Sequence, residues 1–313
     1  MEQSGYAQSL SRHYGRKGLG LAIVEGLRAA GKDRSAIQRD DLAPIDHFHI
    51  RGKEATLELA RLAGLRRGIK VLDVGGGLGG PARTLAGEIG CQVTVLDLTE
   101  EYCRVGEDLT RRTGLGDRVV FCHGSALEMP FPDQTFDAVW TEHSSMNIEQ
   151  KERLYDEIRR VLRAGGRLAM YEIMGGPNAP IHFPVPWARD AASSFLRPPQ
   201  AIRALLSGKH FEEVAWVDVS TPALEWFRKR VAAARAAVAP PPLGLHLLLG
   251  EDFAPMFRNQ VRNLEEGRIA VIMGVWDRPS HPSTSSVPSR VRRPADPRPR
   301  PSSDGPAGSP PSS

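Results

Sequence analysis

Cysteine is scarce in this chain, and long apolar runs are missing. Its 313 residues include three cysteines, Cys91, Cys103 and Cys122, an odd number without a Cys-x-x-Cys pair. A disulfide framework or a zinc knuckle is therefore not expected, and no metal site is predicted. The longest apolar runs, such as Leu243–Gly250, are far too short to cross a bilayer, and no apolar stretch follows the charged N-terminus as in a secretory signal. We expect a cytoplasmic protein with no membrane partner.

Excess positive charge lies mostly at the C-terminal end. The formal net charge is +4 at pH 7, and residues 281–313 contain five Arg and two Asp, which leaves +1 for residues 1–280. Nucleic acid is not an expected partner, because binding it requires a basic face on the folded part. Residues 279–313 are rich in Pro, Ser and Arg and poor in large apolar side chains, so we predict a disordered tail there.

Short β-rich runs alternate with helical stretches from about Lys70 onward. This alternation predicts βαβ units and a Rossmann-like, doubly wound α/β fold with a seven-stranded, mostly parallel sheet. The helices expected between strands cover residues 81–89, a stretch from about Thr99, and residues 151–162. The predicted strands cover residues 70–74, 92–97, 118–124, 136–143, 165–173, 212–220 and 267–276.

Two helical regions fall outside this alternation. Residues 1–69 are predicted to form an N-terminal helical lid, with helices at Leu19–Ala30 and Lys53–Ala63. Residues 221–266 are predicted to be a helical insertion within a domain that spans residues 70–278. Ligands of open α/β sheets bind beyond the carboxyl ends of the strands, so we expect these cap segments to roof the binding site.

The strongest local signal is a glycine loop between a strand and a helix. The strand ends at Asp73, and Gly75, Gly77 and Gly79 follow before the helix begins. Glycines allow a tight turn and a close approach of the backbone to a ligand, and the helix N-terminus adds free N–H groups. Asp97 ends the next strand, about 20 residues later, where an acidic side chain accepts hydrogen bonds from ribose hydroxyls. The pattern predicts a nucleotide site.

The glycine spacing alone also fits NAD or FAD. Asp73 argues against both, because a carboxylate beside a pyrophosphate would be repelled. It suits a cationic ligand with a free amino group, such as S-adenosyl-L-methionine, although Asp73 could instead hydrogen-bond the amides of its own loop.

The Asp-x-Gly-x-Gly-x-Gly sequence after a strand resembles the first motif of class I S-adenosylmethionine-dependent methyltransferases. Residues 123–140 and 157–173 resemble the later motifs of the same family, in the same order. The resemblance implies S-adenosylmethionine as cofactor and further cofactor contacts at Leu98, Ser125, Ala126 and Glu142. Ser125 departs from the family, which often has Asp at this position to meet the adenine amino group.

The resemblance extends to a subgroup of small-molecule enzymes that includes sarcosine/dimethylglycine N-methyltransferase-like proteins. It spans roughly residues 10–278 and is carried by residues 41–52, 141–148, 182–188 and 243–250. It implies that the methyl acceptor is a small molecule and leaves a homo-oligomer possible.

Residues after the fourth strand should face the methyl acceptor, by the same rule that places ligands at strand ends. His143 is the preferred catalytic residue, because a histidine takes up a proton near neutral pH; Tyr14 and His49 are the alternatives. An arginine fork for a substrate carboxylate could come from Arg51 or Arg189. The remaining candidates for substrate contact are Met146, Asn147 and Trp187. Each has a plainer interpretation, as a core histidine, a packed tryptophan or a solvated arginine.

We therefore expect a methyltransferase, with N-methylation of an amino-acid-derived amine as the first hypothesis. Methylation of oxygen, carbon or sulfur on a natural product stays open, because the fold supports all of these. An NAD-dependent oxidoreductase and a non-catalytic S-adenosylmethionine-binding protein are the alternatives from other classes. A metalloid methyltransferase is not expected, because residues 1–90 lack the cysteine that such enzymes use.

Overall fold

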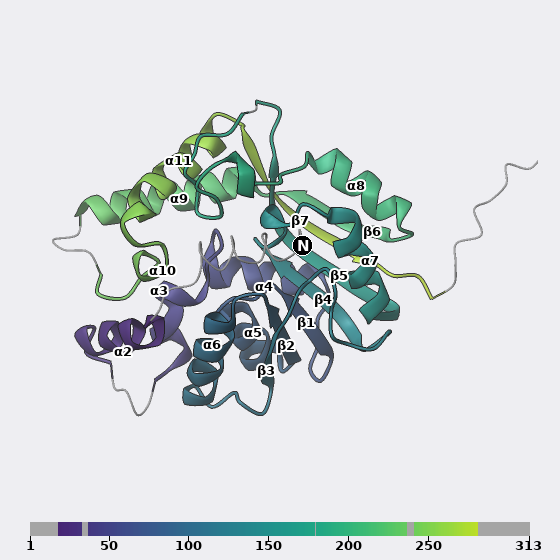
Figure 1. Ribbon diagram of the computed structural model, residues 1–313, viewed down its shortest axis with the longest axis horizontal. Helices are drawn as coiled ribbons and strands as arrows, with labels where there is room; N and C mark the ends of the chain where they lie inside the picture. Colours follow the sequence, from purple (N-terminus) through teal and green to yellow (C-terminus); the bar gives the residue numbers. More distant parts are fainter. Residues whose placement is uncertain (1–17, 33–36, 179, 237–240, 281–313) are drawn as a thin grey trace, which may run out of the picture. The chain divides into compact units, whose positions relative to one another are not determined.

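The computed structural model describes residues 18–32, 37–178, 180–236 and 241–280 (Figure 1). All of these belong to one structural unit, Met1–Pro282. Tyr14 and residues 281–313 of the predicted tail lie outside the described residues.

The seven predicted strands form a single sheet in the order β3-β2-β1-β4-β5-β7-β6. All neighbouring pairs are parallel except those of β7, which runs antiparallel to β5 and to β6. This is the expected mostly parallel, Rossmann-like α/β sheet. The strands are β1 (Lys70–Val74), β2 (Gln92–Asp97), β3 (Val119–His123), β4 (Phe136–Glu142), β5 (Leu162–Gly175), β6 (Glu212–Asp218) and β7 (Ile269–Asp277).

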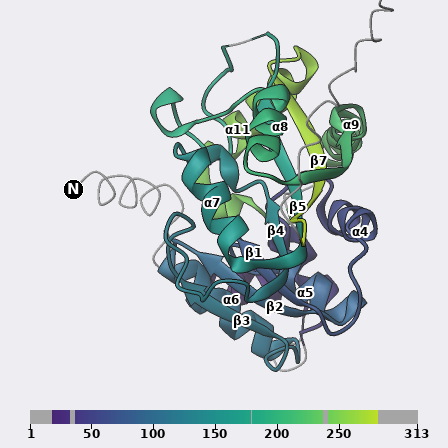
Figure 2. The ribbon, with the colours of Figure 1, turned by 90° about the vertical axis from the view of Figure 1, so that its right-hand side faces the viewer.

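Successive residues of the central strands enter two different apolar cores. In β1, Val71 packs into the core beneath α4, α5, α9 and α11, whereas Leu72 packs into the core beneath α7 and α8. Because side chains alternate across a strand, a strand covered on both faces needs apolar residues on both, and β1 has Val71 on one face and Leu72 and Val74 on the other. Figure 2 shows helices on both sides of the sheet.

The helices connect the strands and cover the sheet. The helix predicted at residues 81–89 divides into a regular first part and a π-helical turn. The helix α8 (Pro199–Gly208) was not predicted. The other helices are α2 (Leu19–Ala29), η1 (Arg39–Leu42), α3 (Ala43–Asp46), α4 (Gly52–Leu62), α5 (Gly80–Thr84), η2 (Leu85–Ile89), α6 (Glu100–Arg112), η3 (Ser145–Asn147), α7 (Lys151–Val161), η4 (Ala191–Ser193), α9 (Ser220–Ala236), α10 (His246–Leu249), η5 (Gly250–Asp252) and α11 (Phe253–Glu265).

The N-terminal helices and the late helical region meet each other. Helix α2 contacts α10, and Figure 1 shows α2, α3 and α10 at the same end of the unit. At Gly26 of α2, an added Cβ would lie 2.8 Å from the carbonyl oxygen of Pro242, so only glycine permits this approach. Leu27 of α2 and Leu248 of α10 share an apolar cluster with Leu78, which lies within the glycine loop. Two distant parts of the sequence thus form a continuous cover.

No helix among the described residues is both long and apolar enough to cross a membrane. The three cysteines are free thiols, with Cys91 and Cys103 buried and Cys122 half-buried.

Candidate active site

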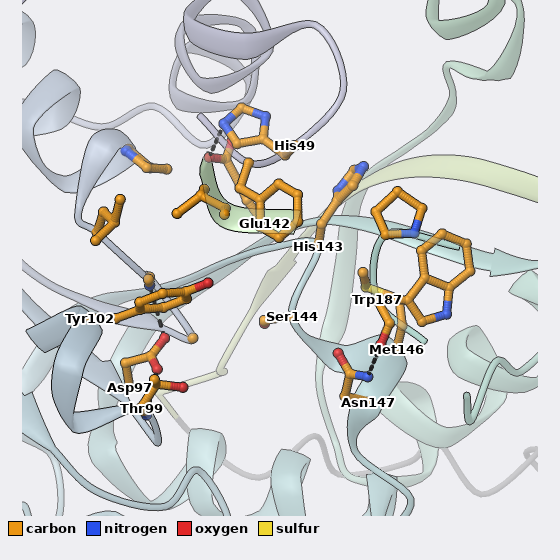
Figure 3. Close-up of a pocket in the computed structure, with 18 of the residues that line it drawn as sticks. His49, Asp97, Thr99, Tyr102, Glu142, His143, Ser144, Met146, Asn147 and Trp187 are labelled. Atoms are coloured by element: carbon orange, nitrogen blue, oxygen red, sulfur yellow. Dashed lines mark hydrogen bonds and ion pairs between the residues drawn. The ribbon is translucent and has the colours of Figure 1, made fainter. Parts of the chain in front are cut away.

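A cavity of about 190 Å³ opens at the carboxyl ends of β1, β2, β4 and β5, beneath the helical cover. The glycine loop forms its floor, and residues from α3, the turn after β4, α9, α10 and α11 form its walls. Figure 3 shows Asp97, Thr99 and Tyr102 on one side and Met146, Asn147 and Trp187 on the other, with His143 between them. The cavity therefore has two ends, one beside the glycine loop and one beneath the late helices.

The glycine loop needs glycine because its backbone lies very close to neighbouring groups. Gly75 has a φ of +72°, and its N–H donates to the carbonyl of Leu96 over 2.7 Å, which ties the loop to β2. At Gly76, an added Cβ would lie 2.5 Å from Oδ2 of Asp73. The loop thus passes directly beside the Asp73 carboxylate. Sequence reasoning did not single out Gly76, although it stands in the same run of glycines.

The carboxylate of Asp73 is buried and lines the cavity, and neither of its oxygens has a hydrogen-bond partner among the described residues. Burial, and to a smaller extent the nearby Asp97, raises the pKa of Asp73 to about 8. The alternative that Asp73 hydrogen-bonds the amides of its own loop is therefore wrong. A lone buried carboxylate is a costly arrangement that a cationic ligand would relieve.

Asp97 stands at the end of β2 and is buried beside the loop. Its Oδ2 accepts a hydrogen bond from the N–H of Gly77 over 2.9 Å, and its Oδ1 accepts one from the N–H of Thr99 over 2.8 Å. Burial raises its pKa, and these two N–H groups oppose that effect. Each carboxylate oxygen has a second lone pair, so Asp97 is held in place and can still accept from a ligand.

The other predicted cofactor contacts divide into two groups. Leu98, Ser125 and Ala126 line the cavity, and the Ser125 hydroxyl already accepts from the N–H of Leu127 over 3.1 Å. Gly79 does not line it. At Gly79 an added Cβ would lie 2.6 Å from Cζ of Phe121, so this glycine is needed for packing beneath the loop.

His143 follows β4 directly, in a left-handed conformation with φ of +50°. Its Nδ1 lies 3.0 Å from the carbonyl oxygen of Tyr171, which can only accept, so Nδ1 carries the hydrogen. The other ring nitrogen, Nε2, is buried without a partner among the described residues and carries a free lone pair. Burial, with a smaller contribution from His49, lowers the pKa of His143 to about 3. The cavity thus holds a neutral imidazole that can accept a hydrogen bond.

Glu142, the last residue of β4, forms a buried network with the N-terminal region. Its Oε2 accepts a hydrogen bond from the Thr56 hydroxyl over 3.1 Å and lies 3.1 Å from Nε2 of His49. Burial raises the pKa of Glu142 well above its usual value and lowers that of His49 well below its own. His49 and Glu142 both line the cavity, so the sequence candidates His143 and His49 are brought together there.

The far end of the cavity is apolar and rich in aromatic rings. Phe227 and Phe257 meet edge to face with their ring centroids 5.1 Å apart, and Phe257 also contacts Phe253. Of this wall, sequence reasoning named only Trp187, which is buried. The spacing of residues 253, 257 and 260 along one helical face was the signal that could have found the rest. The wall also includes Ile173, Pro186, Trp226, Leu245, Leu248, Leu249 and Gln260.

Met146 and Asn147 line the cavity from the turn after β4, as expected. The amide of Asn147 donates to the carbonyls of Trp187 and Ser193 over 2.7 and 3.0 Å, so this side chain also joins the turn to the segment after β5.

The two arginines expected to bind a substrate carboxylate do not reach the cavity. Arg51 is held against its own helix by Glu54 and Glu58 at 2.7 and 2.6 Å. Arg189 has a side chain that is 61% exposed and pairs with Asp252 on the surface. The expectation of an arginine fork is therefore wrong, because both guanidinium groups are already paired with carboxylates elsewhere.

Comparison with known protein families identifies the family that the region around this cavity matches. Residues 72–170, which include the glycine loop, Asp97 and Glu142, match the family described as a methyltransferase domain. The chain carries a class I S-adenosylmethionine-dependent methyltransferase domain. This finding speaks against the NAD-dependent oxidoreductase that the glycine spacing alone had left open.

Relatives of this methyltransferase domain act on different substrates, according to their names. Sterol 24-C-methyltransferase ERG6B of Gibberella zeae is 41% identical over 114 residues, which are 36% of this chain and 30% of that protein. This chain spans only between 30% and 48% of the length of three curated relatives that it matches.

Solved structures agree on the fold. Geranyl diphosphate C-methyltransferase of Streptomyces coelicolor superposes with a TM-score of 0.62 at 18% identity, over 87% of this chain and 97% of that one. A Galdieria sulphuraria protein assigned to the sarcosine dimethylglycine methyltransferases gives 0.57 at 18% identity, over 73% and 85%. At these identities the likeness extends to the fold and not to a substrate.

Proposed function

We propose that this protein transfers a methyl group from S-adenosylmethionine to an apolar small molecule, at a hydroxyl oxygen or an electron-rich carbon. The observation that carries this proposal is the composition of the cavity. One end has two buried carboxylates beside a glycine loop, and the other end is walled by aromatic and aliphatic side chains.

The end of the cavity beside the loop fits the cofactor. The unpartnered carboxylate of Asp73 suits its amino group, because a positive charge would stabilise a buried carboxylate that now has none nearby. Asp97, fixed by two backbone N–H groups, suits the ribose hydroxyls. Leu98 and Ala126 would pack against the adenine ring, with the loop of Ser125 along its edge. When bound, S-adenosylmethionine supplies an electrophilic methyl group.

The acceptor end supplies alignment and a proton acceptor. Apolar walls exclude water and hold the acceptor in line with the methyl group, which is the main requirement for this displacement. The Nε2 lone pair of His143 would accept a hydrogen bond from an acceptor hydroxyl and orient its oxygen. Glu142, beside it, would take up the proton that leaves as the new bond forms.

Methylation of an amino-acid-derived amine is less consistent with this cavity. Such an acceptor carries a carboxylate, and no arginine or lysine lines the cavity among the described residues. Transfer of an unpaired carboxylate into an apolar pocket is strongly unfavourable. The relative named for sterol methylation agrees with an apolar acceptor, and it leaves the acceptor atom open.

The test is transfer of labelled methyl groups from S-adenosylmethionine by the full chain. The panel contains apolar phenols, sterols and prenyl alcohols in one arm and glycine, sarcosine and dimethylglycine in the other. His143→Asn is compared with wild type, because asparagine tolerates the left-handed conformation but has no atom at the position of Nε2. Turnover should fall by about 100-fold, with the cofactor affinity unchanged.

His210→Asn provides a matched control, since His210 is also a left-handed histidine and lies exposed outside the cavity. It should keep wild-type turnover. Methylation of the amino acids alone would contradict the proposal, and so would wild-type turnover by His143→Asn.

A further inference from the structure

A row of hydrogen-bonding side chains leads from the cavity to a second hollow on the outside of α5. Nε2 of His49 lies 3.1 Å from Oε2 of Glu142 and 3.1 Å from Nδ1 of His47. Nε2 of His47 lies 3.4 Å from the hydroxyl of Thr84. Glu142 and His49 line the large cavity, whereas His47 and Thr84 line the hollow, so the row joins the two.

The second hollow has a volume of about 10 Å³, which is room for about one water molecule. Its rim includes Asp40, with a side chain that is 82% exposed, and Lys53, at 36%. His49 is buried, and His47 is half-buried. The row therefore begins at buried groups of the large cavity and ends beside solvent-exposed groups.

Methylation of a hydroxyl oxygen or of an electron-rich carbon, as proposed above, leaves one proton to be removed. The acceptor forms a new bond to the methyl carbon, the carbon–sulfur bond breaks, and its electron pair stays on sulfur. The acceptor gives up a proton from oxygen, or from carbon once a carbon atom has been alkylated. Where apolar side chains and a bound acceptor keep water from the reacting atoms, that proton needs another route out of the cavity.

On the basis of the function proposed above, we propose that His49 and His47 relay this proton from Glu142 to the outer hollow. No part of that function requires His47, which does not line the substrate cavity.

The ring nitrogens have the roles that a relay needs. Nδ1 of His49 lies 3.2 Å from the carbonyl of Ile50 and must donate to it, which leaves Nε2 as the nitrogen that exchanges a proton. A proton passes from Glu142 to Nε2 of His49 and on to Nδ1 of His47. His47 then releases a different proton from its Nε2 toward Thr84 and the hollow. Each histidine ends neutral, and His47 ends with its hydrogen on Nδ1, so its ring must turn over before the next turnover.

The charges around His47 prevent it from storing the proton. Arg83, Lys53, Asp46 and Asp40 face it across the hollow, and Asp46 is already paired with Arg83. Burial, Arg83 and Lys53 together lower the pKa of His47 to about 3. A cationic His47 is therefore short-lived, as expected of a group that conducts a proton and does not act as the final base.

Two substitutions at His47 test the relay with an acceptor that the full chain methylates. In His47→Gln, an amide fills the site and forms hydrogen bonds but cannot take up one proton and release another. In His47→Ala, the missing ring leaves room for added imidazole. Both should lower kcat by about tenfold or more with KM and cofactor affinity unchanged. Imidazole should restore the alanine variant and not the glutamine variant.

His182→Ala is the matched control, because His182 is a paired histidine outside both cavities. It should keep wild-type kcat with and without imidazole. Wild-type kcat in His47→Gln, or a loss in His47→Ala that imidazole does not reverse, would overturn the relay.

A second measurement needs no acceptor. In the full chain with ¹⁵N-labelled histidine and S-adenosylhomocysteine, the ring hydrogens should be bonded to Nδ1 of His49 and to Nε2 of His47, which is the state from which the relay starts. Both resonances should persist in His182→Ala, and that of His47 should vanish in His47→Gln. A hydrogen bonded to Nδ1 of His47 in wild type would overturn the relay. By contrast, absence of any methyl transfer by wild type would overturn only the proposed function.

Discussion

Replacing Asp73 by asparagine should stabilise the ligand-free protein and weaken its binding of S-adenosylhomocysteine, which carries the same amino group as the cofactor. The pKa of Asp73 is raised from 3.8 to about 8, with burial as the main cause. Between these two values the unfolded chain loses the proton and the folded chain keeps it. The free energy of unfolding of wild type therefore falls as the pH rises from about 4 to about 8.

The size of the effect follows from that difference. At pH 7 the suppressed ionisation destabilises the folded state by about 4 kcal/mol at most, at about 1.4 kcal/mol for each pH unit. The substitution Asp73→Asn removes this penalty, but its buried, unpaired amide costs about 1–3 kcal/mol of folding free energy in exchange. The variant should therefore gain about 1–3 kcal/mol at pH 7, or several degrees in Tm, and should lose about 1–2 kcal/mol at pH 4, where the cost of the amide remains and the wild-type penalty is nearly gone.

Ligand binding should change in the opposite direction. The ammonium group of the ligand favours the ionised carboxylate, so binding to wild type below pH 8 releases a proton. Affinity should rise by up to about tenfold for each pH unit until the ligand amino group loses its own proton near pH 8. Asp73→Asn should bind more weakly and release no proton.

Scanning calorimetry at pH 4 and pH 7, and titration calorimetry in two buffers of different ionisation enthalpy, measure both effects. Asp133→Asn is the control, since Asp133 is a surface carboxylate with a side chain that is 72% exposed. A lower Tm for Asp73→Asn at pH 7, or unchanged affinity and proton release, would refute the reasoning.

Three further substitutions probe the two ends of the cavity. Asp97→Ala should weaken S-adenosylmethionine binding by about 1.5–3 kcal/mol through lost charged hydrogen bonds, and unchanged affinity in a folded variant would be inconsistent with that role. Gly76→Ala places a Cβ 2.5 Å from the Asp73 carboxylate and should weaken cofactor binding by about tenfold or more; Gly208→Ala, where a Cβ meets nothing within 4 Å, should leave affinity unchanged. Phe257→Ala should raise KM for an apolar acceptor by about tenfold or more without changing cofactor affinity, because a ring of the apolar wall is lost; steady-state kinetics would show an unchanged KM if this wall does not touch the acceptor.

Most of the fold could be predicted from the sequence because its signals are local. Strands such as Lys70–Val74 are apolar on both faces, and the glycine run follows at once, so strand, turn and helix are determined within about a dozen residues. Helix α8 was missed although Pro199 opens it and Ile202 and Leu206 share one face. It is short and follows a long loop, so its periodicity was easy to overlook.

The candidate site also has a part that local sequence signals predict and a part that they do not. Asp73 and Asp97 could be assigned to the cavity because each ends a strand of the predicted sheet. The pairing of Arg189 with Asp252 and the contact of Thr56 with Glu142 join residues 63 and 86 positions apart, and no sequence pattern encodes them. Arg51 pairs within its own helix, so its i, i+3 glutamate could have warned against a substrate role.

The most direct test of an apolar acceptor site is a competition between two acceptors that differ in one group. A phenol with an apolar side chain and the same phenol with a carboxylate at the end of that chain are offered together, with labelled S-adenosylmethionine, to the full chain. The account predicts that kcat/KM favours the apolar member by about 100-fold or more, because no cation of the cavity wall meets the carboxylate. Equal use of both acceptors, or preference for the carboxylate, would contradict it.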